Sequence, residues 1–284
     1  MNGRAKDQGL RAMGVVGAAL LVLSMFSVGH AQRRRGYGAM GDPNDFYTPP
    51  GYVGNHPYDG RFTFARIKYR GFDHFAQEGP GWAHDYPRAD SHLMLIMREV
   101  TALRPFVREG PIIGGNIVAL DDPQLFKYPV AYMSEPGGWH PNLEELKGFR
   151  EYLMKGGFIV FDDFGDDFRA PGGSDLLNAQ QEIQRVMPAV KILPLPKTHP
   201  IFDAFFTIDP EKIPWTRTVA YRGRPQFFAI FEDNDPRKRV MAVLGNNLDI
   251  GEAWEFSDEG FEPVSESNEA YKLGVNFLIY ALTH

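Results

Sequence analysis

"NLEELKGFREYLMKGGFIVFDDF", residues 142–164, holds a helix, its end and a buried strand in direct succession. Asn142 stands at the N-cap position, and Glu145, three residues later, completes a capping-box pattern. Apolar residues recur at helical spacing until Gly156 and Gly157, which end the helix. The unbroken apolar run that follows is typical of a strand buried on both faces. The stretch therefore predicts a helix followed at once by a strand inside a sheet.

A strand is also expected before this helix, because "YPVAYMSE" at 128–135 is a short apolar run. A crossover of this length makes the two strands parallel. The same reading of the remaining sequence predicts strands at 62–69 and 190–196, a hairpin of 219–233 with 238–247, and helices at 90–104, 174–187 and 269–282. This alternation predicts an α/β fold of three αβα layers around a mostly parallel sheet.

The composition excludes several classes of function. The chain has 284 residues, 43% of them hydrophobic, which is enough for one substantial core. Its formal net charge of -6 argues against a nucleic-acid partner, because protein surfaces that bind nucleic acids are usually strongly basic. The absence of cysteine removes every cysteine nucleophile and every thiolate metal ligand.

The first 31 residues have the three-part pattern of a secretory signal peptide: a basic start, an apolar stretch at 13–28, and the small residues Gly29 and Ala31. An exported protein, periplasmic or extracellular, is therefore expected, with an uncleaved membrane anchor as the alternative. Residues 32–60 are rich in Gly, Pro and Tyr and predict a linker or arm, and 61–284 predict a single α/β domain. No later segment is apolar enough to span a membrane.

Aspartates follow the predicted strand at 158–164 and its turn. Ligands in open α/β sheets bind outside the carboxyl ends of the strands, so Asp162 and Asp163 are candidate catalytic residues. Asp163 and Asp166 are also candidate metal ligands, and oxygen ligands suit a divalent cofactor such as Mg²⁺ or Ca²⁺. Successive strand residues point to opposite faces, so Asp162 and Asp163 cannot share one ion unless the turn rotates them. The alternative is a set of capping and solvated carboxylates.

The stretch "WAHDYPRADSH" starts at Trp82 and combines an aromatic residue with possible metal ligands. Trp82 is a candidate ligand-binding residue, and Asp85 is a candidate metal ligand. His84, Asp90 and His92 have side chains of the same kind, but the spacing matches no established metal motif. The alternative is a loop that caps the next helix at Asp90.

Two other predicted strands end in polar loops. "SEPGGWHPN" supplies Glu135 and Trp139 as candidate ligand-binding residues and His140 as a candidate catalytic proton carrier. In the alternative, Trp139 covers an edge of the core. "GNNLDIGEAWEF" adds Asp249 as a candidate ligand-binding residue, although this loop can equally be a polar turn closed by Gly251.

Five stretches in order, "FTFARIKYRG", "WAHDYPRADSHL", "YPVAYMSEPG", "LKGFREYLMKGGFIVFDDFG" and "EAYKLGVNFLIYALTH", resemble the uncharacterised bacterial family called domain of unknown function 4159. The resemblance covers residues 61–284. It implies a flavodoxin-like fold of the class I glutamine amidotransferase type. In such folds the turn after the Gly-Gly and the apolar strand can hold a nucleophile. Here that turn holds Asp162 and Asp163, and without cysteine the chain cannot carry out glutaminase chemistry.

Two classes of function remain. No nucleophile and base can be assembled by spacing, which favours a non-catalytic binding or assembly domain with an envelope protein or a glycan as its partner. The alternative is a carboxylate- or metal-dependent hydrolase acting on a glycan or peptide. An enzyme predicts that Asp85, His140, Asp163 and Asp249 surround one pocket. A binding domain predicts an exposed apolar groove.

Overall fold

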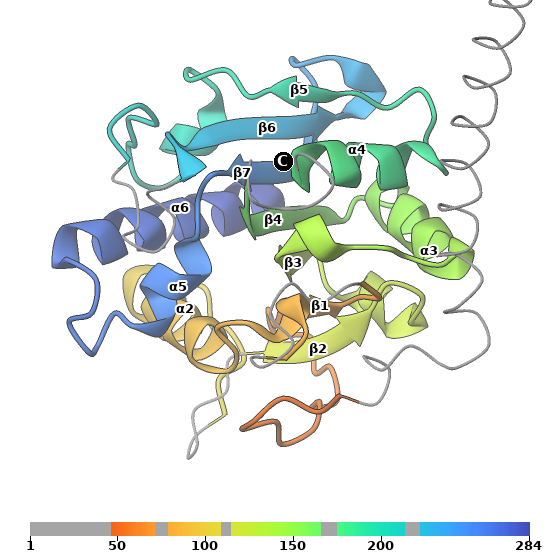
Figure 1. Ribbon diagram of the computed structural model, residues 1–284. Helices are drawn as coiled ribbons and strands as arrows, with labels where there is room; N and C mark the ends of the chain where they lie inside the picture. Colours follow the sequence, from red (N-terminus) through yellow and green to blue (C-terminus); the bar gives the residue numbers. More distant parts are fainter. Residues whose placement is uncertain (1–46, 72–78, 109–114, 166–174, 214–221) are drawn as a thin grey trace, which may run out of the picture. The chain divides into compact units, whose positions relative to one another are not determined.

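The computed structural model describes residues 47–71, 79–108, 115–165, 175–213 and 222–284. A seven-stranded sheet, ordered β2-β1-β3-β4-β7-β6-β5, runs through it (Figure 1). The strands are β1 (Phe64–Lys68), β2 (Gly115–Ala119), β3 (Val130–Ser134), β4 (Phe158–Phe164), β5 (Ile192–Pro194), β6 (Gln226–Phe231) and β7 (Val240–Asn246).

Most of the sheet is parallel, as predicted. Strands β2, β1, β3, β4 and β7 are all parallel neighbours, and β6 and β5 add an antiparallel edge. The predicted hairpin is confirmed, because β6 pairs with β7 in the antiparallel sense. If the five parallel strands are numbered 1 to 5 in chain order, with β7 as the fifth, they lie in the sheet in the order 2-1-3-4-5. The sequence did not predict β2, a strand of only five residues that lies at the sheet edge.

Helices cover both faces of the sheet. They are α2 (Arg88–Val100), α3 (Leu143–Met154), α4 (Asp175–Gln184), α5 (Ile250–Glu255) and α6 (Val264–Thr283). The buried side chains of α2, α5 and α6 belong to one hydrophobic cluster, and those of α3 and α4 belong to a second cluster on the other face. The α/β class and the mostly parallel sheet are thereby confirmed, and helices on both faces are compatible with the predicted three αβα layers (Figure 1). None of the helices in the described ranges is long and apolar enough to cross a membrane.

The central helix and strand form as their sequence predicts. Asn142 accepts a hydrogen bond from the backbone N–H of Glu145 at 2.9 Å, and its own N–H donates to the Glu145 carboxylate at 2.8 Å. Both halves of the capping box are therefore present in α3. Gly156, with φ of 102°, turns the chain after the helix, and every residue of β4 is buried.

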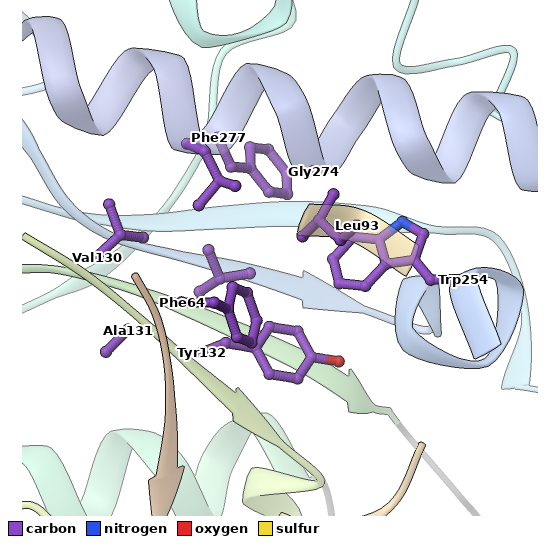
Figure 2. A pocket seen from close by; sticks show the side chains of 10 residues that line it. Phe64, Leu93, Val130, Ala131, Tyr132, Trp254, Gly274 and Phe277 are labelled. Carbon is purple, nitrogen blue, oxygen red and sulfur yellow. The ribbon is translucent and has the colours of Figure 1, made fainter. Parts of the chain in front are cut away.

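The core between α6 and the sheet is closely packed. Figure 2 shows Phe64, Leu93, Tyr132, Trp254 and Phe277 around a void of about 10 Å³, too small to hold a ligand. The Tyr132 hydroxyl lies at the outer end of this apolar layer. It donates to a carboxylate at the end of β4, so the core leads directly to the polar edge of the sheet.

Residues 47–60, the described part of the expected linker, are fastened to the edge strand β2. The Asn55 side chain exchanges two hydrogen bonds with the backbone of Ile117, at 2.6 and 2.9 Å. His56 and Asn116 form a similar reciprocal pair. These contacts place the segment in the compact unit Tyr47–His284. The expected signal peptide and residues 32–46 lie outside the described ranges.

Candidate functional site

Polar side chains gather at the carboxyl ends of the parallel strands. The connection after β1 leads to α2 on one face of the sheet, and the connection after β3 leads to α3 on the other. This reversal creates a switch point between β1 and β3, where open α/β sheets bind ligands. The turn at His84 and Asp85 follows β1, Glu135 follows β3, and Asp163 lies near the end of β4. The site is therefore built where the topology favours one.

Several residues at this edge have a left-handed backbone. The φ angles are 62° for Asp85, 46° for Glu135, 52° for Asp163 and 58° for Asn247. This conformation is uncommon outside glycine and persists only where the surroundings impose it. In β4 it coincides with a shift in register between Phe161 and the strand end. The turn thus rotates Asp163 out of the strand alternation, the condition under which it can join a site apart from Asp162.

Asp162 points into the protein, on the α5 side of the sheet. Its carboxylate accepts hydrogen bonds from the Tyr132 hydroxyl at 2.7 Å and from the backbone N–H of Gly251 at 2.9 Å and of Ile250 at 3.1 Å. Burial raises the pKa of Asp162 to about 7, against the opposing effect of the Tyr132 hydrogen bond. The visible role of Asp162 is to fix the start of α5, and its catalytic role stays a prediction.

Asp163 belongs to a group in which charges are balanced. Its Oδ1 lies 2.8 Å from Nη1 of Arg222, and His84 Nδ1 lies 2.8 Å from Glu135 Oε1. The possible metal-ligand atoms of His84, Glu135 and Asp163, a ring nitrogen and two carboxylate oxygens, all lie within 4.8 Å of one another. We call His84, Glu135, Asp163 and Arg222 the paired group, because each carboxylate has a basic partner.

His84 is held in its charged form. Burial alone would lower its pKa, but the hydrogen bond and the negative charge of Glu135 outweigh burial and raise the pKa to about 9. The other ring nitrogen, Nε2, is buried and has no hydrogen-bond partner within the part of the chain that the structure describes. The imidazole thus has one nitrogen fixed by Glu135 and a second, buried nitrogen that no group in the described ranges satisfies.

A second group of carboxylates lacks such partners. Oxygens of Asp85, Glu252 and Glu255 lie within 4.8 Å of one another, and we call these residues the unpaired group. Asp85 is only partly buried as a residue, yet its Oδ2 is inaccessible and has no hydrogen-bond partner in the described ranges. Burial and then the charge of Asp163 raise the pKa of Asp85 well above its usual range, and raise that of Glu252 to about 7. None of the three carboxylates forms a salt bridge in the described ranges, and the charge of Arg66 only partly offsets the rise in the pKa of Asp85, so a proton or a cation is needed to neutralise the group.

The short helix α5 brings two of these carboxylates into place. Asp249 caps it by accepting a hydrogen bond from the backbone N–H of Glu252 at 2.8 Å. A Cβ atom on Gly251 would collide with Asp85 Oδ2 and would lie 2.6 Å from the Tyr132 hydroxyl. Glycine at this position is therefore what lets α5 approach the turn that holds Asp85.

Besides His84, the structure brings together four of the residues given a role from the sequence: Asp85, Glu135, Asp163 and Asp249. Their mutual electrostatic influence appears in Asp249, whose pKa is raised well above its usual range by burial and then by Asp163 and Asp85. Asp166, predicted as a metal ligand, lies outside the described residues. The roles assigned to the four remain predictions, but their convergence is an observation.

The two tryptophans lie elsewhere, in the core. Trp82 and Trp139 are 1% and 0% exposed, and Trp139 packs against Phe149 and Phe161. Neither indole face is open to a ligand, so the prediction that they bind one does not fit the structure. The alternative given for Trp139, that it covers the core, describes its position.

Three other candidates also make separate contacts. His140 faces α4, where its Nδ1 lies 3.6 Å from Glu182 Oε1, so it is placed with that carboxylate and not with Asp163. Asp90 does not cap α2, which starts two residues earlier, and instead pairs with a buried arginine. His92 Nδ1 lies 2.8 Å from the Trp254 carbonyl oxygen.

Sequence reasoning missed Glu255 and Arg222 as residues of the site. The sequence does not mark Glu255, because α5 has only six residues and the stretch that contains it also fits a polar turn. Asp249 followed by Glu252 three residues later is a capping pattern that could have indicated a helix start. It would have placed Glu252 and Glu255 one helical turn apart, on one face. Arg222 has no sequence signal that marks it.

These features define an α/β domain with a carboxylate-rich site at the switch point of a mostly parallel sheet. The chain belongs to the family described as Domain of unknown function (DUF4159), whose model matches residues 63–282. The family resemblance drawn from the five sequence stretches is thereby confirmed. A search of curated proteins found no match to the chain.

Proposed function

We propose that this domain is a hydrolase that depends on a divalent cation. The cation binds at the unpaired group, and the paired group beside it handles the proton transfers. The observation that carries the proposal is the convergence of Asp85, Glu252 and Glu255 without a basic partner in the described ranges. Carboxylates this close repel one another unless a cation or protons neutralise them.

The ligand set supports a hard cation. Carboxylate oxygens without sulfur or imidazole suit Ca²⁺ or Mg²⁺, which take oxygen ligands. A bound divalent ion can polarise a substrate oxygen or lower the pKa of a bound water. The unpartnered Oδ2 of Asp85 supplies a ligand atom that folding has already stripped of water.

The paired group supports the chemistry that hydrolysis requires. Asp163 can accept a proton from an attacking water, and His84 can donate one from Nε2 to the leaving atom. Arg222 and Glu135 hold these two side chains in position at 2.8 Å each. The strand order supports a doubly wound, flavodoxin-like arrangement, in which the switch point is the usual ligand site.

The substrate class follows from the expected export of the chain. A protein that carries a signal peptide meets the polymers of the cell envelope, so a glycan or a peptide is the proposed substrate. The signal-peptide pattern of residues 1–31 is what supports this part of the proposal.

A binding or assembly domain is the second candidate, and one observation favours it. A groove of about 610 Å³ lies along β5 and β6, with Leu195, Phe202 and Phe227 in its apolar lining and Lys197 and Arg224 at polar positions. Its described lining includes no residue of the paired or unpaired group. A partner bound there would leave the carboxylates unused, so the two candidates are separable by experiment.

The test is an assay of the full chain on a bacterial cell-wall glycan preparation and on a mixed peptide substrate. New reducing ends and new amino termini are measured with Ca²⁺, with Mg²⁺ and with EDTA. We expect cation-dependent product that Asp163→Asn reduces by at least about a hundredfold, the scale of losing an acid–base group. Glu144→Gln, a change of an exposed carboxylate on α3, is the control. Product formed equally in EDTA, or no product on either substrate, would overturn the proposal.

A further inference from the structure

Arg66 is a fully buried cation in the middle of β1. Its side chain is 0% exposed, and that of its partner Asp90 is 2% exposed. Removing two charges from water costs several kcal/mol per ion, and a hydrophobic pair of similar volume often gives equal or greater stability. The pair is therefore weak evidence for stability alone, and the other contacts of Arg66 indicate what it does.

The guanidinium divides its donors between a helix and a turn. Nε and Nη2 donate to the Asp90 carboxylate at the start of α2. Nη1 donates to the backbone carbonyl oxygens of Trp82 at 3.1 Å and of His84 at 2.8 Å. The ring of Tyr132 lies 5.0 Å from Cζ, so the guanidinium is also held from the neighbouring strand.

The contact with the His84 carbonyl reaches Asp85 directly. That carbonyl belongs to the peptide unit that joins His84 to Asp85, and a peptide unit is planar. Fixing its oxygen therefore fixes the direction in which the chain enters Asp85, whose φ of 62° is left-handed. The same bond sets where the His84 side chain leaves the turn.

We propose that Arg66 is a positioning residue for cation binding: from inside the sheet, it holds the turn that presents Asp85 to Glu252 and Glu255. This inference rests on the proposed function, because it concerns the cation site defined there. Arg66 touches no ligand itself and acts through two backbone carbonyls. Asp162 positions the other part of the cation site, because its carboxylate holds the start of α5, the helix that carries Glu252 and Glu255.

The experiment titrates the full chain with Ca²⁺ and with Mg²⁺ in a calorimeter, and the variants are compared with the ion that binds, written here as Ca²⁺. The variant is Arg66→Met combined with Asp90→Leu, which replaces the buried pair by apolar side chains and so leaves no charge unpaired. We expect cooperative unfolding to persist, while Ca²⁺ affinity falls by about tenfold or more, as it does when residues that orient metal ligands are changed. Arg66→Lys keeps the charge but loses the forked donors, and we expect an intermediate affinity.

Ile183→Val is the control for a purely structural effect. Ile183 lies on α4 in the opposite layer, and its shortening removes packing without touching the turn. We expect it to lower the unfolding temperature and leave Ca²⁺ affinity unchanged. A double variant that binds Ca²⁺ as tightly as the unchanged chain would overturn the role of Arg66 and leave the cation site standing. An unchanged chain that binds neither Ca²⁺ nor Mg²⁺ would overturn both.

Discussion

At the scale of single residues, the site combines strained backbone with unneutralised charge. Asp85 shows both features, since it has a left-handed φ and a buried oxygen without a hydrogen-bond partner in the described ranges. Each feature costs stability, and each persists only because the rest of the fold compensates. Residues of this kind mark functional sites more often than packing sites.

Glu252→Gln is predicted to make the protein more stable and less able to bind a cation. The substitution removes one negative charge from the unpaired group, whose members raise one another's energy. Without divalent cations at pH 8, we expect the unfolding temperature to rise by about 2 °C, the shift typical of a sub-kcal/mol gain in a domain of this size. Thermal unfolding followed by circular dichroism measures it. Glu144→Gln, an exposed carboxylate paired with Lys147 on α3, is the control and should give no gain.

The buried Glu145 carboxyl is expected to make the stability of the protein depend on pH, independently of the carboxylate site. Burial raises its pKa to about 7 from an ordinary value of 4.5, against the opposing backbone hydrogen bonds from Asn142 and Arg70. The folded state therefore holds this proton more tightly than the unfolded state. The contribution of protonated Glu145 to the free energy of unfolding is fully present below pH 4.5 and is lost as the pH rises through 7.

Glu145→Gln tests that dependence, since it removes the titrating group. We expect the free energy of unfolding of the unchanged chain to fall relative to the variant between pH 4.5 and 7, as measured by urea denaturation. Glu144→Gln, one residue away and exposed, should run parallel to the unchanged chain. Parallel curves for Glu145→Gln would show that Glu145 titrates normally.

The residues of the site could be predicted from the sequence only where they directly follow an obvious strand. Asp163, Glu135 and Asp249 each come after an apolar run, so their meeting at one edge follows from parallel strands. Arg66 could not be recognised, because a basic residue in an alternating strand ordinarily faces water. Its burial depends on Asp90, a partner 24 positions further on.

At the scale of elements, α5 decides the geometry of the cation site. It is six residues long and is held by Asp162 at its start and by its Asp249 cap. Elements with a full capping and spacing pattern, such as α3, were predicted correctly. A helix of fewer than two turns has too few apolar positions for its period to be recognised, so the existence of α5 depended on tertiary contacts.

Gly251→Ala is predicted to separate α5 from the turn that carries Asp85. The new methyl group would collide with Asp85 Oδ2 and the Tyr132 hydroxyl, and such overpacking typically costs 1–3 kcal/mol, so we expect about 2 kcal/mol of lost stability. We expect Ca²⁺ affinity in a calorimetric titration to fall by about tenfold or more. Ile159→Val, a packing change in β4, should destabilise the protein without altering affinity. Unchanged affinity in Gly251→Ala would mean that α5 does not set the site.

The cap of α3 is the corresponding test of an element that the sequence did predict. Asn142→Ala removes the side-chain acceptor of the capping box, and we expect a loss of about 1 kcal/mol in the free energy of unfolding. Urea denaturation measures this loss. Asn142→Asp keeps an acceptor and should retain most of the stability, and equal losses in both variants would contradict the capping role.

At the scale of the whole molecule, the fold class was predictable and the site was predictable only in outline. Alternating strands and helices dictate a layered α/β arrangement, and the parallel crossover at 128–164 fixes the direction of its central strands. The positions of β2 and of the antiparallel edge depend on pairing between segments far apart in the chain. Local patterns do not encode such pairing, and this is also why the unpaired group, drawn from two distant segments, was not found.

The proposed function depends most on the unpaired group being a cation site. Calorimetric titration of the full chain with Ca²⁺ and with Mg²⁺ at pH 8 tests this directly, with Asp85→Asn as the variant and Asp258→Asn, an exposed carboxylate paired with Arg88, as its matched control. We predict saturable binding of one of these ions to the unchanged chain and to Asp258→Asn, weakened at least about tenfold in Asp85→Asn. No saturable binding of either ion, or equal affinity in Asp85→Asn, would contradict the account.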